Sequence, residues 1–382
     1  MDNDGRRAKE GTTSKTNASR KGKTVKKSKI VIFAVEILVL AVLIGALWIL
    51  KDFGTETTVD GQEGEAGKGP LIQVDFADVD ISINEQIENN EIMQNYRNIA
   101  LFGVDSRTGA LTKGTLSDCI IIASINLDTG DVKLVSVYRD TLLNLSNDKY
   151  NKCNSAYSSG GAEQAIKMLN MNLDMDIKDF VTVGFDGLTA TIDALGGVYL
   201  DVDSEELEHI NNYQKTMAED MHISYTPVET TGYQLLNGLQ ATAYCRIRYK
   251  TGNDFARAAS QREVIQAIAD VAKKADLKTL TKVANDVSKY VYTSFGLEEI
   301  IGLLGDIAKY NIVDEEGFPR SDLRGSDTLG SRGSCVFPIN LEENVVWLHE
   351  FLFEDMDYEP TAEVKEYSKV IHDIVSDYVR ID

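Results

Sequence analysis

One short stretch of an acidic chain is rich in basic side chains. The 382 residues carry a formal net charge of −21, yet the segment Tyr244–Glu263, YCRIRYKTGNDFARAASQRE, is rich in arginine. Its basic residues are Arg246, Arg248, Lys250, Arg257 and Arg262. The planar guanidinium group of arginine suits bidentate contact with phosphate oxygens. The segment therefore indicates either an anion-binding site or a ladder of internal ion pairs, and spacing alone leaves the two equally open.

The spacing of this stretch predicts that four polar side chains converge. Arg246 and Arg248 are two apart in a strand-like run, so their side chains leave the same face. On the helix expected next, Arg257 and Gln261 are four apart and share a face. A strand, a turn and a helix would thus present all four toward one pocket. Arg262 lies off that face and need not belong to the site.

Charged residues also stand at the ends of three apolar runs, 98–104, 119–125 and 132–138, which are typical of buried strands. They are Asp105, Arg107, Asp118, Arg139 and Asp140. Taken singly, each Asp suits a turn or a helix cap, but α/β folds bind ligands where strand ends meet. Carboxylates among arginines suit Mg²⁺ held between carboxylates and a substrate phosphate. The group as a whole predicts a phosphoryl-transfer or pyrophosphate-binding site.

The elements that must position these residues follow from periodicity and turn signals. The second and third apolar runs flank a turn at 128–131 and predict a hairpin. Further strands are expected at 179–185 and 198–202, and helices at 160–173 and 186–195. Later helices are expected at 257–274, 277–291, 296–309, 340–353 and 361–379. This order predicts an α/β fold, an α-β-α sandwich with a central mixed sheet.

The N-terminal part predicts a membrane anchor. Residues 1–29 form a basic tail, and residues 30–50 are apolar apart from Glu36, long enough for one transmembrane helix. The basic flank predicts a cytoplasmic N-terminus and an extracellular remainder. Residues 51–94 are expected to be an extracellular stalk or linker, with a short helix within 80–94. We expect a catalytic domain over 95–275 and a mainly helical extension over 276–382.

Composition excludes several classes of function. The part outside the membrane is strongly acidic, so nucleic acid and anionic lipid are poor general partners. The cysteines, at 119, 153, 245 and 335, lack Cys-x-x-Cys spacing, which gives no support to a zinc site. Because Cys119 and Cys245 lie in apolar, strand-like runs, buried free thiols are expected more than a disulfide. The scattered histidines show no metalloprotease motif.

Six ordered blocks resemble one family. They are NIALFGVDSR, SDCIIIASIN, VKLVSVYRDT, NKCNSAYSSGGAEQAIKMLN, DFVTVGFDGLTATIDALGGVYLDV and LNGLQATAYCRIRYKTGNDFARAASQREVI. In order and spacing they are similar to the LytR–CpsA–Psr family over roughly Asn98–Asp270, and the anchor and stalk fit the same architecture. Six blocks in order are far more specific than a lone motif.

The resemblance implies a phosphotransferase of the cell membrane, mostly in Gram-positive bacteria. Such enzymes move a teichoic acid, capsule polysaccharide or similar anionic glycopolymer from an undecaprenyl-pyrophosphate carrier to peptidoglycan. The acceptor is the C6 hydroxyl of N-acetylmuramic acid, and the product is a phosphodiester. The family also has an apolar pocket for the polyprenyl chain, between the sheet and helices.

The resemblance also implies roles for individual residues. Asp105 and Asp118 would hold Mg²⁺ at the pyrophosphate. The phosphates would be bound by Arg107, Arg139, Arg246, Arg248 and Arg257, with Gln261 assisting. The catalytic group would be Asp105, Arg107, Arg139, Asp140 and Asp254. The general base stays open among Asp105, Asp140 and Asp254.

The chain departs from the family pattern at three positions. Tyr138 stands where many relatives have proline, and Leu116 and Ser260 stand where arginine is common. These departures leave the donor preference open. Two other functions also stay open: a membrane-anchored regulator or receptor that binds a lipid-pyrophosphate ligand, and a polyprenyl-pyrophosphate hydrolase.

Overall fold

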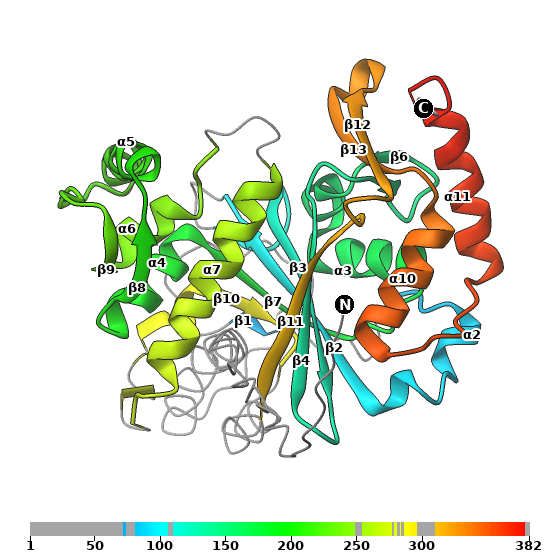
Figure 1. Cartoon of the computed structure of the whole chain (residues 1–382), viewed down its shortest axis with the longest axis horizontal. Helices are drawn as coiled ribbons and strands as arrows, with labels where there is room; N and C mark the ends of the chain where they lie inside the picture. The colour runs from blue at the N-terminus through cyan, green and yellow to red at the C-terminus, as the bar shows by residue number, and fades with distance from the viewer. Residues whose placement is uncertain are drawn as a thin grey trace, which may run out of the picture. The chain divides into compact units, whose positions relative to one another are not determined.

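The computed structural model describes residues 72–73, 81–105, 110–248, 254–276, 279–280, 283, 286–295 and 310–378 (Figure 1). All of them belong to one compact unit. The expected basic tail, the transmembrane segment 30–50, most of the stalk and Arg107 lie outside the described residues. Within the described ranges, no helix has the length and apolar character of a membrane span. The tail, the anchor and its orientation therefore stay predictions.

A seven-stranded mixed sheet organises the fold. Its order is β1 (Ile72–Gln73), β10 (Val291–Thr293), β7 (Asp179–Gly184), β2 (Tyr96–Val104), β3 (Ser117–Asn126), β4 (Asp131–Val137) and β11 (Asn311–Phe318). Strands β2, β3 and β4 form an antiparallel meander, while β7 runs parallel to β2 and β11 runs parallel to β4. The expected hairpin with its turn at 128–131 is confirmed.

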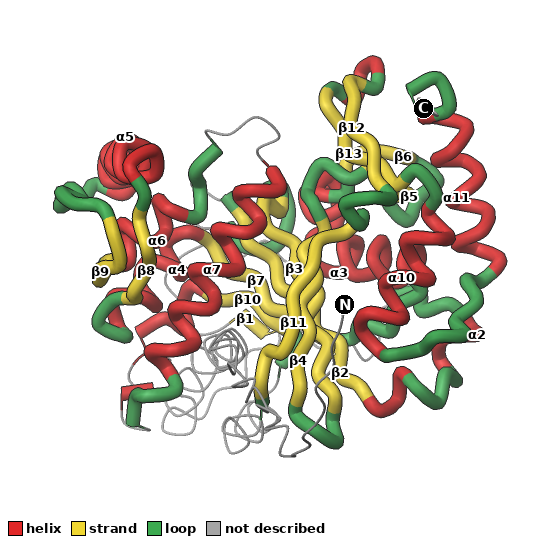
Figure 2. Tube along the Cα trace, in the orientation of Figure 1, coloured by secondary structure: helices red, strands yellow, loops and turns green. Residues whose placement is uncertain are grey.

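Side chains of the central strands alternate between two separate cores. On β2, Ile99 and Leu101 belong to one core, and Ala100 and Phe102 to the other. The first core is covered by α4 (Phe185–Ala194), α5 (Ser204–Met221), α6 (Gly238–Tyr244) and α7 (Asp254–Ala272). The second is covered by α3 (Asn154–Leu173), α10 (Leu341–Phe353) and α11 (Ala362–Val375). Figure 2 shows the sheet between these two groups of helices, so the predicted α-β-α sandwich with a mixed sheet is confirmed.

The register of β2 and β3 sets the edge of the sheet where the site forms. Gly103 pairs with Cys119 and Val104 with Ser117, with a shift of register between the two pairs. A Cβ atom at Gly103 would come within 2.8 Å of the Cβ of Cys119, so only glycine allows this close approach. The end of β2 and the start of β3 therefore lie side by side. This places Asp105 and Asp118 at the same edge.

One local prediction is wrong. The run that contains Tyr244, Arg246 and Arg248 is not a strand: Tyr244 ends α6, and Cys245 and Arg246 lie in the turn that follows it. The Asn237 side chain caps α6 by accepting from the backbone N–H of Gln240, while the Gln240 side chain accepts from that of Asn237. A helix end, not a pleated face, therefore positions the two arginines.

The described C-terminal residues differ from the expected mainly helical extension. Helices α10 and α11 confirm the helices expected at 340–353 and 361–379. However, β10 and β11 join the central sheet, and β12 (Arg324–Thr328) pairs with β13 (Ser334–Pro338) in a separate hairpin. The helix expected at 296–309 lies outside the described residues. Of the range 277–291, where a helix is expected, the described residues 279–280, 283 and 286–287 are helical. Ser288–Tyr290 form a short 3₁₀ helix, and β10 follows.

Candidate active site

Arg139, which follows β4, is the centre of a charged cluster. Its Nη1 lies 2.7 Å from Oδ1 of Asp118, and its Nε lies 3.3 Å from Oδ2 of Asp254 and 3.5 Å from Oδ2 of Asp140. Its side chain is only 18% exposed. Burial opposes its charge, but Asp118 and Asp254 together raise the pKa of Arg139. Three of the predicted carboxylates therefore surround one predicted arginine, which stays protonated.

Arg257, in the first turns of α7, is the most buried cation of the cluster, with 4% of its side chain exposed. Its Nη2 lies 3.0 Å from Oδ1 of Asp254 and donates to the carbonyl oxygen of Asp118 at 3.4 Å. Its Nε and Nη1 have no hydrogen-bond partner among the described residues. Burial lowers the pKa of Arg257, and Arg139 and Arg248 lower it further. Such unsatisfied, buried N–H groups are suited to receive oxygens of an anionic ligand.

The two arginines after α6 reach the same place. The Nη2 of Arg248 lies 3.5 Å from Oδ2 of Asp118. The Nη2 of Arg246 lies 3.6 Å from Oδ2 of Asp105, and its guanidinium lies 4.6 Å from the ring centroid of Phe185. Arg248 and Arg257 thus meet at Asp118 as predicted, although by a different local geometry, whereas Arg246 lies at Asp105, at the end of the adjoining strand. Internal ion pairs are present as well, because each of these three arginines contacts a carboxylate.

The carboxyl groups of Asp140 and Asp254 share a hydrogen bond. Burial and the hydrogen bond with Asp254 raise the pKa of Asp140, although Lys152, 3.0 Å away, acts in the opposite direction. Burial alone would raise the pKa of Asp254 too, but its hydrogen bond with Asp140 and the charges of Arg257 and Arg139 lower it to about 2. Asp140 therefore holds a proton more tightly than Asp254 does, and Asp254 stays ionised.

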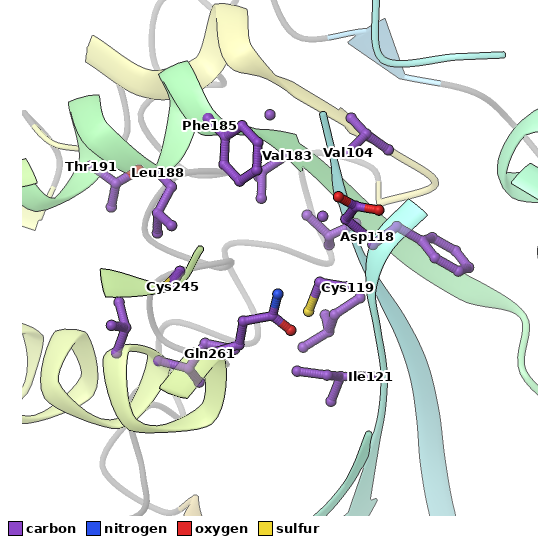
Figure 3. Close-up of a pocket in the computed structure, with 17 residues that line it drawn as sticks. Val104, Asp118, Cys119, Ile121, Val183, Phe185, Leu188, Thr191, Cys245 and Gln261 are labelled. Atoms are coloured by element: carbon purple, nitrogen blue, oxygen red, sulfur yellow. The ribbon is translucent and has the colours of Figure 1, made fainter. Parts of the chain in front are cut away.

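An apolar cavity of about 110 Å³ opens beside the cluster, between the sheet and helices α4 and α7 (Figure 3). Its walls include Leu101 and Ile121 of the sheet, Leu188 of α4, and Val264 and Ile265 of α7. Asp118 also lines this cavity. One carboxylate thus belongs both to the charged cluster and to the wall of an apolar chamber.

Gln261 and two thiols also lie on the wall of the cavity. In Figure 3 the Gln261 amide lies between Cys119 and α7. Gln261 therefore lies on the cavity wall, one helical turn beyond Arg257. Cys119 and Cys245 face the same space and are free thiols, as are Cys153 and Cys335. Burial raises the pKa of Cys119 to about 12, so this thiol is unreactive at neutral pH.

The oxygen ligands at this edge fit Mg²⁺ only in combination with a substrate. In the described part of the chain, no three side chains of His, Cys, Asp or Glu are grouped so that they could hold a metal ion alone. At phosphate sites, however, Mg²⁺ uses one or two carboxylates together with substrate oxygens. Asp105 and Asp118, at the adjoining ends of β2 and β3, supply two such carboxylates. Their chemistry and placement fit that mode of binding.

Two further residues complete the comparison with the sequence. Lys152, at the end of β6 (Tyr150–Lys152), pairs with Asp140 and was missed. It stands in the block NKCNSAY, which could have indicated it. Arg262 lies off the site, as predicted: its Nε lies 3.2 Å from Oε1 of Glu315, and its Nη1 donates to Ser136 at 2.8 Å.

The chain is similar in sequence to proteins of one known family. The LytR_cpsA_psr family profile matches residues 72–337. The polyisoprenyl-teichoic acid–peptidoglycan teichoic acid transferase TagV of Bacillus subtilis is 27% identical over 275 residues, which cover 69% of this chain and 65% of TagV. The biofilm regulatory protein A of Streptococcus mutans is 31% identical over 209 residues, which cover 51% of this chain and 49% of that protein. The matched segments thus span about half to two thirds of these relatives.

Solved structures share the fold. The LytR-CPS2A-psr family protein YwtF (TagT), with bound octaprenyl pyrophosphate lipid, aligns with a TM-score of 0.51 and 21% identity. The alignment covers 77% of this chain and 99% of that one. At this identity the likeness shows the fold alone. The family profile, however, spans well over half of the sequence, and the chain belongs to the LytR–CpsA–Psr family.

Proposed function

We propose that this protein transfers an anionic glycopolymer phosphate from an undecaprenyl-pyrophosphate carrier to peptidoglycan during cell-wall assembly. One observation carries the proposal: Asp118 is shared by a cluster of arginines and by an apolar cavity. A ligand with a pyrophosphate in the arginine cluster and a hydrocarbon chain in the apolar cavity must be amphiphilic, as a polyprenyl pyrophosphate is. The TagV relative bears the name of such a transferase, and the TagT structure holds a polyprenyl pyrophosphate.

The arginines bind and polarise the donor in this proposal. Arg139, Arg248 and Arg257 converge around Asp118 and Asp254, so pyrophosphate oxygens can accept N–H groups from several directions. The acceptor hydroxyl, proposed as the C6 hydroxyl of N-acetylmuramic acid, attacks the phosphorus that carries the glycan. A new P–O bond forms, the bond to the bridging oxygen breaks, and polyprenyl phosphate leaves. Fixed guanidinium groups stabilise the charge that develops on the leaving oxygen.

Asp140 is the proposed general base. A base must accept a proton, and the pKa of Asp254, at about 2, makes that carboxylate a weak acceptor. The raised pKa of Asp140 suits proton transfer better. In this proposal the proton of the acceptor hydroxyl moves to Asp140, and Lys152 keeps the Asp140 carboxylate in place at 3.0 Å.

Asp105 and Asp118 are the proposed ligands of Mg²⁺. A divalent cation there would offset the charge of the pyrophosphate and of the leaving group. The carboxylates already contact Arg246, Arg139 and Arg248, so these side chains hold them in place before donor binds. We also propose that residues 30–50 anchor the protein in the cell membrane with this site outside, close to a lipid-borne donor.

A reconstitution assay tests the proposal. The full-length protein in lipid nanodiscs would be incubated with Mg²⁺, a polyprenyl-pyrophosphate-linked glycan and a muramic-acid-containing acceptor, and the products analysed by mass spectrometry. An acceptor–phosphate–glycan adduct is the expected product. Free glycan phosphate would instead identify a hydrolase. Donor binding without turnover would favour a regulator or receptor, the class suggested by the name of the S. mutans relative.

A further inference from the structure

Arg324, the first residue of β12, lies beside two aromatic residues that adjoin the charged cluster in the sequence, Tyr138 and Phe255. Its guanidinium carbon lies 3.7 Å from the ring centroid of Phe255 and 5.0 Å from that of Tyr138. Its Nη1 donates to the hydroxyl of Tyr138 at 3.0 Å and to the carbonyl oxygen of Pro319 at 3.3 Å. Two aromatic rings and two oxygens therefore hold this arginine in place.

The residues that hold Arg324 are direct neighbours of the active-site group. Tyr138 precedes Arg139, and Phe255 follows Asp254. Their rings meet edge to face with centroids 4.5 Å apart. On the other side of Tyr138, β11 carries Gly317, where a Cβ atom would overlap the Tyr138 ring and hydroxyl. The fold thus makes room for an aromatic support beneath Arg324, next to the two residues at the centre of the charged cluster.

The charge of Arg324 is not neutralised within the described residues. The chain has 60 acidic and 39 basic residues, and the cluster arginines 139, 246, 248 and 257 each contact a carboxylate. Arg324 contacts none in the described part of the chain; its partners there are aromatic rings, a hydroxyl and a carbonyl oxygen. A structural arginine in so acidic a protein would be expected to pair with an acid. Arg324 therefore has no anionic partner in that part of the chain.

The position of Arg324 relative to the apolar cavity indicates which part of the proposed donor lies near it. The apolar cavity lies in the layer of α4 and α7. The β12–β13 hairpin packs on the other layer, where Cys335 and Phe337 of β13 join the core that contains α3 and α11. Figure 1 shows the tip of the hairpin on the side of α3 and α11, whereas Arg324, at the start of β12, contacts Phe255 in the first turn of α7. The charged cluster adjoins both: Asp118 lines the cavity, and the neighbours of Arg139 and Asp254 in the sequence, Tyr138 and Phe255, contact Arg324.

We propose that Arg324 binds the anionic glycan of the donor, next to the pyrophosphate and on the side opposite the lipid chain. This inference rests on the proposed function, because that function supplies the donor. A cation already held by Phe255 and Tyr138 loses little conformational freedom when a ligand binds. Glycan phosphates or carboxylates that leave the cluster toward the β12–β13 hairpin accept from its remaining N–H groups. Arg324 therefore selects donors with charged glycans.

A charge-removing substitution tests this inference. Arg324→Met keeps the length of the side chain and its stacking on Phe255, but removes the charge. Two donors would be compared, a polyprenyl-pyrophosphate disaccharide with and without an oligo(glycerol phosphate) chain. For the charged donor we expect KM to rise about tenfold with kcat within about twofold, the size of one charge-assisted hydrogen bond. For the uncharged donor, both constants should stay within about twofold.

Two variants serve as controls. Arg324→Lys retains the charge and should recover most of the affinity for the charged donor. Arg320→Met removes an arginine that also lies over an aromatic ring, Trp347, but that pairs with Asp322 at 2.9 Å. It should behave as the wild type with both donors.

The outcomes separate this inference from the proposed function. If Arg324→Met loses activity equally with both donors and has a lower melting temperature, Arg324 has a packing role and the inference is wrong. Unchanged binding of the charged donor by this variant would also overturn the inference. If the wild type transfers neither donor, the proposed function fails. The inference can then still be tested by measuring equilibrium binding of the charged donor to the wild type and to Arg324→Met. About tenfold weaker binding by the variant, with a difference that becomes smaller at high salt, supports the inference. Equal binding by the two proteins refutes it.

Discussion

The Nη1 of Arg139 lies 2.7 Å from Oδ1 of Asp118. This ion pair links Arg139, two positions beyond the end of β4, to Asp118, the second residue of β3. The same arginine contacts Asp140 and Asp254 through its Nε. In the proposed function, donor binding replaces these carboxylates with phosphate oxygens, and Arg139 is already charged and oriented for that exchange.

Replacing either partner of this pair should abolish turnover. Arg139→Ala leaves Asp118, Asp140 and Asp254 without their common cation, and Asp118→Ala removes the carboxylate shared with the cavity. We expect kcat to fall by about 100-fold or more in each variant, as when a transition-state donor is lost. Circular dichroism should show an intact fold. Arg320→Ala, at an exposed ion pair, should retain normal activity; near-normal rates in both active-site variants would refute this site.

The pH profile of kcat/KM should contain an acid limb that belongs to Asp140. Burial and the hydrogen bond with Asp254 raise the pKa of Asp140, so activity should fall as the pH falls through this raised pKa. Asp140→Asn should reduce the rate by about 100-fold or more and remove the limb. In Asp254→Asn, the loss of the neighbouring charge should lower the pKa of Asp140 and move the limb to lower pH. A limb that persists in Asp140→Asn would assign the base to another group.

Substitutions of Gln261 test whether its side chain lines the cavity for the polyprenyl chain or binds the pyrophosphate. Its side chain lines the apolar cavity (Figure 3), so Gln261→Leu, of similar size, should change kcat/KM by less than about threefold. Gln261→Glu places a charge where the polyprenyl chain would lie, and should raise the KM for the lipid donor by about tenfold or more. Both would be measured with the reconstituted assay. A loss of 100-fold or more in Gln261→Leu would instead support direct contact with the pyrophosphate, as the family resemblance implies.

The strands that carry the site were predictable because they are buried on both faces. The apolar runs at 98–104, 119–125 and 132–138 need no alternation when both sides of a strand face a core. Once these strands are recognised, the charged residues at their ends must meet at one edge. Asp105, Asp118 and Arg139 followed from that geometry.

The segment before Arg246 was mistaken for a strand because every residue of α6 is buried. A helix without an exposed face shows no amphipathic period, so only its capping box, Asn237 with Gln240, marked its start.

Strand β11 was missed because its central residues are exposed and charged, the opposite of a buried helix. Its central residues Asp314–Glu316 are exposed at the edge of the sheet, and their charges hide the strand pattern.

The support of Arg324 could not be predicted from spacing. Its hydrogen bond to Tyr138 spans 186 residues, and cation–aromatic stacking leaves no periodic trace in a sequence. The space beside Tyr138 depends on Gly317, which lies on a strand that was itself missed. Such contacts can be recognised only once all strands of the sheet, β11 included, are placed.

His349 should set part of the acid sensitivity of folding. It is fully buried on α10, stacks on Tyr358 with ring centroids 3.5 Å apart, and its Nε2 lies 3.0 Å from the carbonyl oxygen of Leu173. Its Nδ1 has no hydrogen-bond partner among the described residues. Burial lowers the pKa of His349 from 6.5 to about 4. Between these values the unfolded chain binds a proton that the folded protein does not.

The free energy of unfolding should therefore decrease as the pH falls from 6.5 to 4, because protonation favours the unfolded state. The contribution of His349 is about 1.4 kcal/mol per pH unit, or about 3 kcal/mol over the whole window. Several buried carboxyl groups titrate nearby, so the informative quantity is the difference between two proteins. Urea unfolding of wild type and His349→Gln at pH 7, 6 and 5 should show this slope in the wild type and its loss in the variant. His372→Gln, at an exposed position of α11, should retain the slope; identical slopes in wild type and His349→Gln would show that His349 is protonated equally in both states.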